Sequence, residues 1–296
     1  MSDQQQAQQA RLGVPKTYKL FVGGRFPRSE SGRVYEVAEA KTGSWLANAP
    51  RGTRKDARDA VAAARGAFPG WSAATAYNRG QVLYRVAELL QGRREQFADE
   101  VAAAEGLTAR RAAQQVDAAI DRWVWYAGWT DKIAQVAGSA NPVAGPYFNL
   151  SAPEPVGVVG VVAPQADGGS GHALLGLVSV LAPVLAAGNT AVVLLSSAAP
   201  LPGLSLGEVL ATSDVPAGVV NLLSAERVAD VAPTLASHAD VNALALPGRD
   251  AELEAAAAET LKRVFAGSED WSATPNGTRR LLAFCETKTV WHPVGS

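Results

Sequence analysis

The sequence has very little of several residue types that define whole classes of protein. It contains one cysteine, Cys285, one methionine and three histidines in 296 residues. A single cysteine cannot build an internal disulfide framework or a cluster of thiolate ligands for zinc. The histidines, at positions 172, 238 and 292, lie far apart along the chain. We therefore expect neither a disulfide-stapled protein nor a metal site.

An excess of charge of one sign is absent as well. The chain carries 27 lysines and arginines against 28 aspartates and glutamates, a formal net charge of -1, and no block of like charge stands out. Because a nucleic-acid-binding surface normally carries a clear basic excess, we expect no nucleic acid partner. Hydrophobic residues make up 48% and charged residues 19%. This composition is typical of a globular chain with a substantial core.

Signals for secretion or membrane insertion are weak. Residues 1–9 are polar and glutamine-rich and lack the basic and apolar regions of a signal peptide. We expect a disordered leader over residues 1–16 and a cytoplasmic protein. The uncharged run 173–195 is long enough for a bilayer span, but Pro183 and the helix-stopping sequence at 188–190 interrupt it. We interpret this run as a buried helix followed by a buried strand, without membrane contact.

Helical patterns dominate the first half of the chain. Short alternations of apolar and polar residues at 18–26 and 33–37 predict a small hairpin or edge strands. Apolar residues at helical spacing then predict three helices, at about 53–69, 76–104 and 108–137. Gly106 is expected to end the second of these.

In the second half, strand-type and helix-type segments alternate. The apolar run 155–163 (PVGVVGVVA) is typical of a strand buried on both faces. The predicted strands are 156–163, 190–195, 218–223 and 242–246, and the predicted helices are about 172–187, 203–212, 226–237 and 250–263. This alternation predicts an α/β fold with a doubly wound, Rossmann-like parallel sheet, whose ligands bind at the carboxyl ends of the strands. A last segment, 280–296, includes a strand near 288–291.

One strand-end loop has the composition of a ligand site. Residues 164–171 (PQADGGSG) are glycine-rich and lie between a strand and a helix, where backbone N–H groups can hold a phosphate. Gly169 and Gly171 match the first two glycines of the dinucleotide fingerprint, but its third position falls on Leu174. Two interpretations stay open: a contact with a nucleotide, or a plain connection.

Candidate nucleophiles are few. Cys285 lies among apolar residues, where a lone cysteine behaves as a small hydrophobic side chain. Ser170 and His172 share a loop, but no acidic residue is placed to orient the histidine. We therefore predict no catalytic residue.

Three segments resemble the aldehyde dehydrogenase superfamily. Residues 154–164 (EPVGVVGVVAP) are similar to the family's first Rossmann strand, 181–190 (LAPVLAAGNT) to its helix-to-strand segment, and 215–221 (VPAGVVN) to the entry of the next strand. The resemblance covers about residues 18–265 and implies the fold of the family's NAD-binding domain, with amino-terminal helices and a terminal strand. It divides the chain into a domain at 17–266, with a hairpin and helical part (17–150) and a Rossmann-like part (151–266), then a linker (267–279) and a tail (280–296).

The chain departs from the family at the positions that carry its chemistry. Where the family has a Trp-Asn pair, this chain has Gln165 and Ala166, so the asparagine that donates to the oxyanion is missing. The lysine that holds the adenosine ribose is replaced by Leu194, its neighbouring glutamate by Ser197, and the catalytic glutamate by Gly267. The family's catalytic domain, which carries the nucleophilic cysteine, has no equivalent between the Rossmann-like part and the terminal strand of this chain. The resemblance thus implies a truncated, degenerate member, a pseudoenzyme.

The resemblance also sets the expected ligands and partners. If a cofactor is bound, its contacts are expected at Pro164, Gln165, Gly169, Gly171 and Gly248. Because these positions are degenerate, we expect no bound cofactor. Binding of NAD or NADP is the alternative. In the family, the segments equivalent to 147–151 and 288–291 build subunit contacts. We therefore expect a homo-oligomer or a hetero-oligomer with an active aldehyde dehydrogenase. The alternatives are an NAD(P)-binding oxidoreductase with altered chemistry and a gene product without a selected role.

Overall fold

A five-stranded parallel sheet forms the centre of the protein. The computed structural model describes residues 14–166, 172–267, 269–271, 273, 275 and 277–295. The sheet has the order β7-β6-β5-β8-β9, and every neighbouring pair is parallel. Its strands are β5 (Val158–Val162), β6 (Thr190–Leu194), β7 (Val220–Leu223), β8 (Ala243–Leu246) and β9 (Arg263–Ala266). Because the chain starts in the middle and winds outward in both directions, the predicted doubly wound α/β fold is confirmed.

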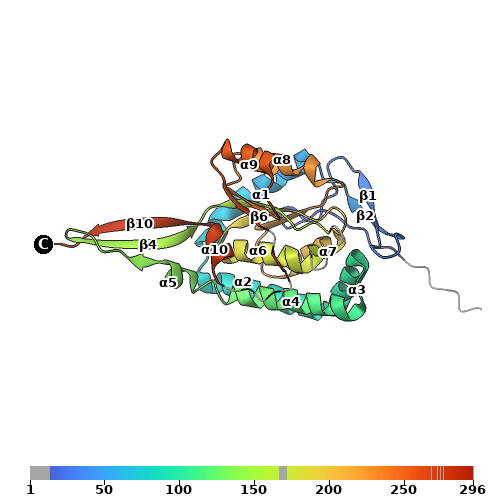
Figure 1. Cartoon of the computed structure of the whole chain (residues 1–296), viewed down its shortest axis with the longest axis horizontal. Helices are drawn as coiled ribbons and strands as arrows, with labels where there is room; N and C mark the ends of the chain where they lie inside the picture. The colour runs from blue at the N-terminus through green and yellow to red at the C-terminus, as the bar shows by residue number, and fades with distance from the viewer. Residues whose placement is uncertain are drawn as a thin grey trace, which may run out of the picture.

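Helices cover both faces of this sheet (Figure 1). One face carries α6 (Leu177–Ala186) and α7 (Leu201–Thr212), and the other carries α1 (Arg54–Ala73), α8 (Ala232–Ser237) and α9 (Ala251–Ala258). Since successive side chains of a strand point to opposite faces, Val159 and Val161 join the core around α6, whereas Val158 and Val162 join the core around α1. Among the described residues, no helix has the length and apolarity needed to cross a membrane.

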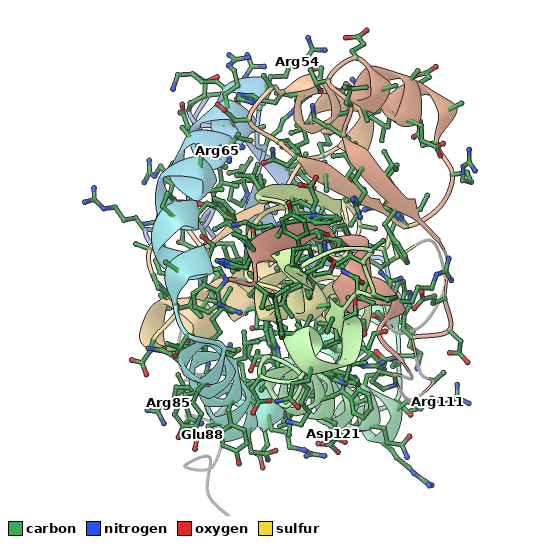
Figure 2. The ribbon with its side chains drawn as sticks, turned by 90° about the vertical axis from the view of Figure 1, so that its left-hand side faces the viewer. Arg54, Arg65, Arg85, Glu88, Arg111 and Asp121 are labelled. Carbon is green, nitrogen blue, oxygen red and sulfur yellow. The ribbon has the colours of Figure 1, made fainter. Side chains whose placement is uncertain are left out.

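A second layer of helices packs outside α6 and α7. It consists of α2 (Ala76–Gly92), α3 (Arg94–Glu105) and α4 (Ala109–Ala127). Figure 2 shows charged side chains on its outer surface, with Arg85 and Glu88 on α2 and Arg111 and Asp121 on α4. This layer therefore has one apolar side, turned to the sheet, and one solvated side.

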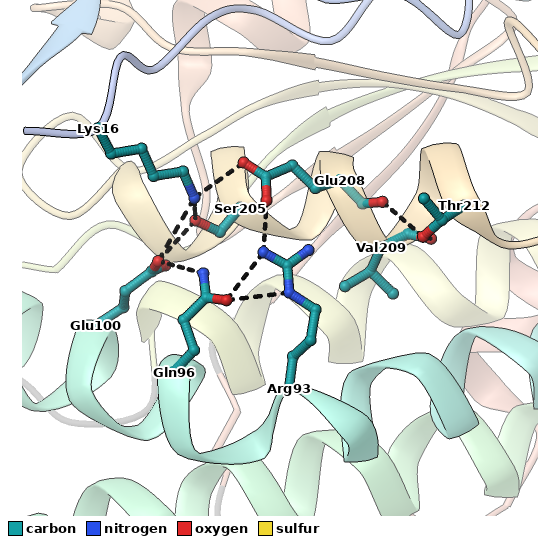
Figure 3. Close-up of polar contacts among 8 residues, drawn as sticks. All are labelled: Lys16, Arg93, Gln96, Glu100, Ser205, Glu208, Val209 and Thr212. Carbon is teal, nitrogen blue, oxygen red and sulfur yellow. Dashed lines mark hydrogen bonds and ion pairs between the residues drawn. The ribbon is translucent and has the colours of Figure 1, made fainter.

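The predicted helix 76–104 is in fact two helices, divided at Arg93. The backbone of Arg93 (φ -113°, ψ 16°) is not helical, and its side chain bonds Gln96 and Glu208 of α7 (Figure 3). The same polar cluster anchors the amino-terminal segment, because Lys16 donates to Ser205 at 2.7 Å and pairs with Glu208 at 2.9 Å. The break lets α3 turn against α7, and the cluster holds Lys16 in place. Residues 1–13 of the expected leader lie outside the described residues.

The predicted helix 108–137 is divided as well. Helix α4 ends at Ala127, and a short helix, α5 (Ile133–Ala137), follows a turn. This turn rests on Gly80 of α2, where a Cβ atom would lie 2.7 Å from the Thr130 hydroxyl and 3.1 Å from the Ala127 carbonyl. Close contact between α2 and the turn therefore sets the end of α4. Gly106, in the left-handed conformation, ends α3 as predicted.

Helix α1 continues beyond the predicted stop near Pro69. It begins at a capping box in which the Thr53 side chain and Asp56 bond each other's backbone N–H groups, and it ends at Ala73. The extra turn carries Trp71 into the core, where its indole N–H donates to the Leu185 carbonyl at 3.3 Å. Burial of this large side chain offsets the free-energy cost of Pro69 inside the helix.

The segment predicted as a helix over 250–263 ends as a strand. Helix α9 stops at Ala258, and the chain reverses at Leu261, which has a positive φ of 54°. Residues 263–266 then form β9 at the edge of the sheet. A four-residue edge strand directly after a helix leaves no periodic pattern of its own, which is why the sequence did not separate the two.

The amino-terminal hairpin includes the predicted strand at 33–37, which is confirmed as β1, but not the predicted strand at 18–26. Its strands are β1 (Val34–Ala38) and β2 (Trp45–Pro50), paired antiparallel. The predicted strand at 18–26 is instead a tight turn in which Phe21 exchanges two backbone hydrogen bonds with Leu222 of β7. Phe21 thereby covers part of the edge of the parallel sheet.

A separate antiparallel sheet projects from the body as an arm (Figure 1). It has the order β10-β4-β3, with β10 (Cys285–Pro293), β4 (Tyr147–Pro155) and β3 (Ser139–Ala140). The predicted strand at 288–291 is confirmed and is longer than expected. We call the projecting strands β4 and β10 the arm, and the carboxyl terminus lies near its tip.

Candidate functional site: the carboxyl edge of the parallel sheet

Side chains tie together the loops that follow β5 and β6. The Gln165 amide nitrogen donates to the Ala163 carbonyl at 2.7 Å, and its oxygen accepts the Ser197 backbone N–H at 3.0 Å. The Ser196 hydroxyl accepts the backbone N–H of Ala166 at 3.0 Å. The polar groups of Gln165 are therefore occupied within the protein, so this residue has a structural task at the site.

A cleft of about 840 Å³ lies between these loops and the β1–β2 hairpin. It is lined by Ala166, Ser197 and Ala198 of the loops, by Glu226 after β7, by hairpin residues 34–40, and by Arg51 and Ala104. Three carboxylates, Glu36, Glu39 and Glu226, face one guanidinium, Arg51, which pairs with Glu226 at 3.1 Å. The cleft is therefore acidic.

Two hydroxyl groups complete the polar lining of the cleft. The Ser197 hydroxyl is buried and has no hydrogen-bond partner among the described residues. Burial, with a contribution from the Glu226 charge, raises the pKa of Tyr35 above its usual value, so its phenol stays protonated. The cleft thus offers carboxylate groups directly, whereas the buried Ser197 hydroxyl reaches a ligand only when its side chain turns toward the cleft.

These residues fit the nucleoside end of a dinucleotide. The volume lies in the usual range for small-molecule sites, and carboxylate and hydroxyl groups are suitable partners for ribose hydroxyls. Among the described lining residues, Arg51 is the one cation, and Glu226 already neutralises it. The described lining residues therefore offer no unpaired cation to the phosphates of such a ligand.

The structure distributes the predicted cofactor-contact residues over this edge. Pro164 is buried directly after β5, with Gln165 beside it. Gly248 follows β8, and a Cβ atom there would meet no heavy atom within 4 Å. Gly169 and Gly171 lie outside the described residues. Pro164, Gln165 and Gly248 share the carboxyl edge, but none of them lines the cleft.

Sequence reasoning missed part of the cleft. Ser197 was named only as a replaced family position, and Glu226 could have been found, since both lie within three residues of a predicted strand's end at the edge where such sheets bind ligands. The hairpin residues at 34–40 carried no such signal. They reach the cleft only through tertiary packing of a segment more than a hundred positions away in the sequence.

The single cysteine is not part of this site. Cys285 opens β10, is 7% exposed, and its thiol donates to the Leu281 carbonyl at 3.3 Å. Burial raises its pKa to about 11, although the Arg263 and Arg79 charges act in the opposite direction. The thiol is therefore neutral at physiological pH and is a poor nucleophile.

Known sequences match most of this chain. The sequence model of the aldehyde dehydrogenase family matches residues 26–267. Retinal dehydrogenase 2 of Gallus gallus is 33% identical over 258 residues, covering 84% of this chain and 48% of that protein. Cytosolic 10-formyltetrahydrofolate dehydrogenase of Mus musculus is 33% identical over 245 residues, covering 80% of this chain and 26% of that protein. The chain therefore spans between about a quarter and a half of the length of these relatives.

Solved structures agree with this match. An NAD+ complex of aldehyde dehydrogenase from Bacillus cereus has a TM-score of 0.76 and 28% identity, covering 84% of this chain and 50% of that one. PnpE in complex with nicotinamide adenine dinucleotide has a TM-score of 0.77 and 30% identity, covering 83% and 50%.

These complexes correct the expectation that no cofactor is bound, because proteins similar to this chain in sequence and fold hold NAD. That expectation relied on the incomplete glycine fingerprint and on the replaced ribose positions Leu194 and Ser197, and it did not consider the cleft beside the hairpin. The family resemblance itself is confirmed, since the family's sequence model covers most of the chain. This chain belongs to the aldehyde dehydrogenase family.

Proposed function

We propose that this chain is a non-catalytic assembly subunit of the aldehyde dehydrogenase family, which oligomerises with a second copy of itself through the arm. The observation that carries this proposal is the exposed apolar surface of β4 and β10. Phe148 and Trp291 are each 57% exposed, and Tyr147 is 46% exposed. Large apolar side chains gathered on a projecting sheet are typical of a contact surface.

The register of the arm assigns these side chains to two faces. Phe148 lies opposite His292, and Leu150 opposite Val290, so these four residues share one face. Tyr147 and Trp291 lie on the other face and their rings contact each other at 5.8 Å. In addition, β10 is an edge strand, whose free backbone groups can pair with a further strand. The arm therefore offers both side-chain and backbone contacts to a second copy.

The chemistry of the chain's own residues supports the non-catalytic part of the proposal. Aldehyde oxidation by nucleophilic catalysis needs an activated nucleophile, typically a thiolate. Cys285 is the single cysteine in the sequence, and it is buried and protonated at physiological pH. In addition, Ala166 at the edge of the cleft has no side-chain donor for an oxyanion.

The assembly role is tested by measuring molar mass in solution. We expect light scattering during size-exclusion chromatography to give a multiple of 30.7 kDa at micromolar concentration. The double variant Phe148→Ser, Val290→Ser should shift the protein to the monomer, whereas Tyr77→Ser, which removes a 70% exposed ring from α2, should not. A monomeric wild-type chain would overturn self-association, and mixing with an active aldehyde dehydrogenase then tests the hetero-oligomer.

A second proposed role, carried by the cleft, is binding of NAD or NADP. We infer that Ser197 and Glu226 hold the ribose hydroxyls of the nucleoside end. Such a cofactor supplies a hydride acceptor when it is bound.

The test of this second role is titration calorimetry with NAD and with NADP. Ser197→Ala should weaken binding about fivefold to tenfold, as expected for one lost hydrogen bond. The matched control Ser237→Ala, on the surface of α8, should leave the heat of binding unchanged.

A further inference from the structure

A second cavity lies beside the β1–β2 hairpin, outside the cleft. It has a volume of about 300 Å³ and is lined by residues of the segments 15–19 and 28–34 and of β2. Every lining residue belongs to the described range 14–166. It shares one lining residue, Val34, with the cleft. We call it the hairpin pocket and define it by six of its lining residues: Tyr18, Lys19, Arg28, Arg33, Trp45 and Asn48.

The hairpin pocket presents three accessible positive charges and no carboxylate in its described lining. The side chains of Lys19, Arg28 and Arg33 are exposed and have no ion-pair partner among the described residues. A fourth lining cation, Lys16, already pairs with Glu208 at 2.9 Å (Figure 3). Because a cavity lined by charges of one sign attracts a ligand of the other, this lining favours an anion with more than one negative charge.

An anchored turn holds two of these cations. The turn at 29–32 closes through the Gly32 N–H, which donates to the Ser29 carbonyl at 2.8 Å. The Ser29 hydroxyl donates to the carboxylate of Asp56, in the first turn of α1, at 2.9 Å. Arg28 and Arg33 therefore flank a turn whose position is fixed by α1.

The third cation comes from the adjoining segment. The Leu20 N–H donates to the Pro27 carbonyl at 3.1 Å, so the residues before Leu20 run beside those after Pro27. This pairing brings Lys19 to the same side of the hairpin as Arg28. Glu30, the nearest acidic residue along the chain, is not part of the lining and accepts the Thr53 hydroxyl at 3.3 Å.

An aromatic side chain lies at the other end of the pocket. Trp45 is 51% exposed, and its indole N–H donates to the Asn48 side-chain oxygen at 3.4 Å. In the hairpin register Trp45 lies opposite Ala38, which is about 13 Å along β1 from Val34, where the turn with the cations ends. A ligand that reaches both ends therefore needs its ring and its anionic group some distance apart.

We propose that the hairpin pocket binds a mononucleotide, whose phosphate contacts Lys19, Arg28 and Arg33 and whose base packs against Trp45. A phosphate monoester carries a charge of about -1.5 to -2 at pH 7 and three acceptor oxygens, which suit a set of charged donors. The ribose supplies the distance between phosphate and ring, and bases stack on aromatic side chains.

The size of the hairpin pocket agrees with this ligand. Its volume of about 300 Å³ lies at the lower end of small-molecule sites, which suits one nucleotide better than two. The site is separate from both roles proposed above, because it uses neither the arm nor the cleft residues Ser197 and Glu226. Its test therefore does not depend on oligomerisation or on binding of NAD.

The experiment titrates the full chain with adenosine 5′-monophosphate (AMP) at constant ionic strength and measures binding by calorimetry. We expect saturable binding, weakened about tenfold or more by the double variant Arg28→Gln, Arg33→Gln. Trp45→Leu should weaken it about fivefold or more through lost stacking. The matched double variant Arg111→Gln, Arg279→Gln removes two exposed arginines that line neither this pocket nor the cleft, and it should leave binding unchanged.

Two fragments of AMP test its two ends separately. Adenosine lacks the phosphate and ribose 5-phosphate lacks the base, so each should bind about tenfold or more weakly than AMP. Ribose 5-phosphate that binds as tightly as AMP overturns the contact with Trp45. Adenosine that binds as tightly as AMP overturns the contact with the three cations.

Each remaining outcome also decides the proposal. Absence of saturable AMP binding overturns it, as does equal binding in wild type and the Arg28, Arg33 double variant. Binding that only Ser197→Ala weakens places AMP in the cleft and likewise overturns it. A single-stranded oligonucleotide that binds more tightly than AMP overturns the choice of a free mononucleotide. Should the double variant fail to fold, as judged by near-ultraviolet circular dichroism, Lys19→Gln takes its place and should weaken AMP binding about threefold.

Discussion

The two edges of the parallel sheet carry polar residues for opposite purposes. At the amino edge, Asn189 accepts the Gly157 N–H at 2.9 Å and donates to the Phe284 carbonyl at 2.9 Å. Asn221 accepts the Gly23 N–H at 2.9 Å and donates to the Gly218 carbonyl at 2.8 Å. At the carboxyl edge, polar groups line an open cleft.

This difference explains which family motifs the chain retains. The retained segments that include Gly157, Asn189 and Asn221 join strands to neighbouring elements, so their task is to hold the fold together. At the carboxyl edge, Gln165 bridges two loops, whereas Ser197 and Glu226 line the cleft. We therefore expect a change at a cleft-lining position to disturb the fold less than a change at the amino edge.

The largest expected effect tests the amino edge directly. Asn189→Ala leaves the buried Gly157 N–H and Phe284 carbonyl without their side-chain partner. We expect a loss of about 3–5 kcal/mol in the free energy of unfolding, since each orphaned buried group costs about 1–3 kcal/mol. Urea denaturation followed by circular dichroism measures it. Gln165→Ala, at the carboxyl edge, should cost about 1 kcal/mol, and an equal loss in both variants would abolish the contrast.

The sequence predicted the parallel sheet well because its strands are buried on both faces. Residues 158–162 and 191–194 are apolar without interruption, a pattern that is typical of strands buried on both faces. Strand β4 was not predicted, since its alternate residues are exposed and Pro153 and Pro155 disfavour a strand in isolation. It pairs along its full length with β10, from the other end of the chain, and also with the short β3.

The candidate site was predicted less completely than the fold. The sequence placed it at the strand ends, and Gln165 is indeed there, but as a bridge between two loops. The cleft depends on where the β1–β2 hairpin packs against the loops that follow β5 and β6. Contacts of this kind follow from tertiary structure and leave no local sequence pattern.

An intermediate effect is expected from a matched pair of glycine substitutions. Gly157 has a φ of 133°, and a Cβ atom there would lie 2.2 Å from the Asn242 side-chain oxygen. Gly157→Ala should therefore lower the free energy of unfolding by about 2–4 kcal/mol, through backbone strain and displacement of Asn242. Gly248→Ala, at the carboxyl edge, has open space and should change it by less than about 1 kcal/mol. Thermal and urea denaturation of both variants compare the edges; similar losses would contradict the assignment.

The smallest effect concerns the pH dependence of stability at the amino edge, where Cys285 begins β10 next to Phe284. The folded pKa of about 11 lies above the usual thiol value of 9.0, so between these values the folded state retains a proton that the unfolded state has lost. The stability is therefore fully present below pH 9 and falls as the pH rises toward 11, by about 1.4 kcal/mol per pH unit.

Urea denaturation at several pH values between 8 and 11 measures this slope. Cys285→Ala lowers stability at pH 8 but should flatten the dependence between pH 9 and 10, which separates the thiol from general alkaline effects. Tyr18, with its pKa raised to about 12, adds its own loss only above about pH 10, and it does so equally in both proteins. Parallel curves for wild type and Cys285→Ala over pH 9–10 would show that the thiol ionises as freely in the folded protein as in the unfolded chain. A freely ionising thiol would also remove one argument for the non-catalytic role.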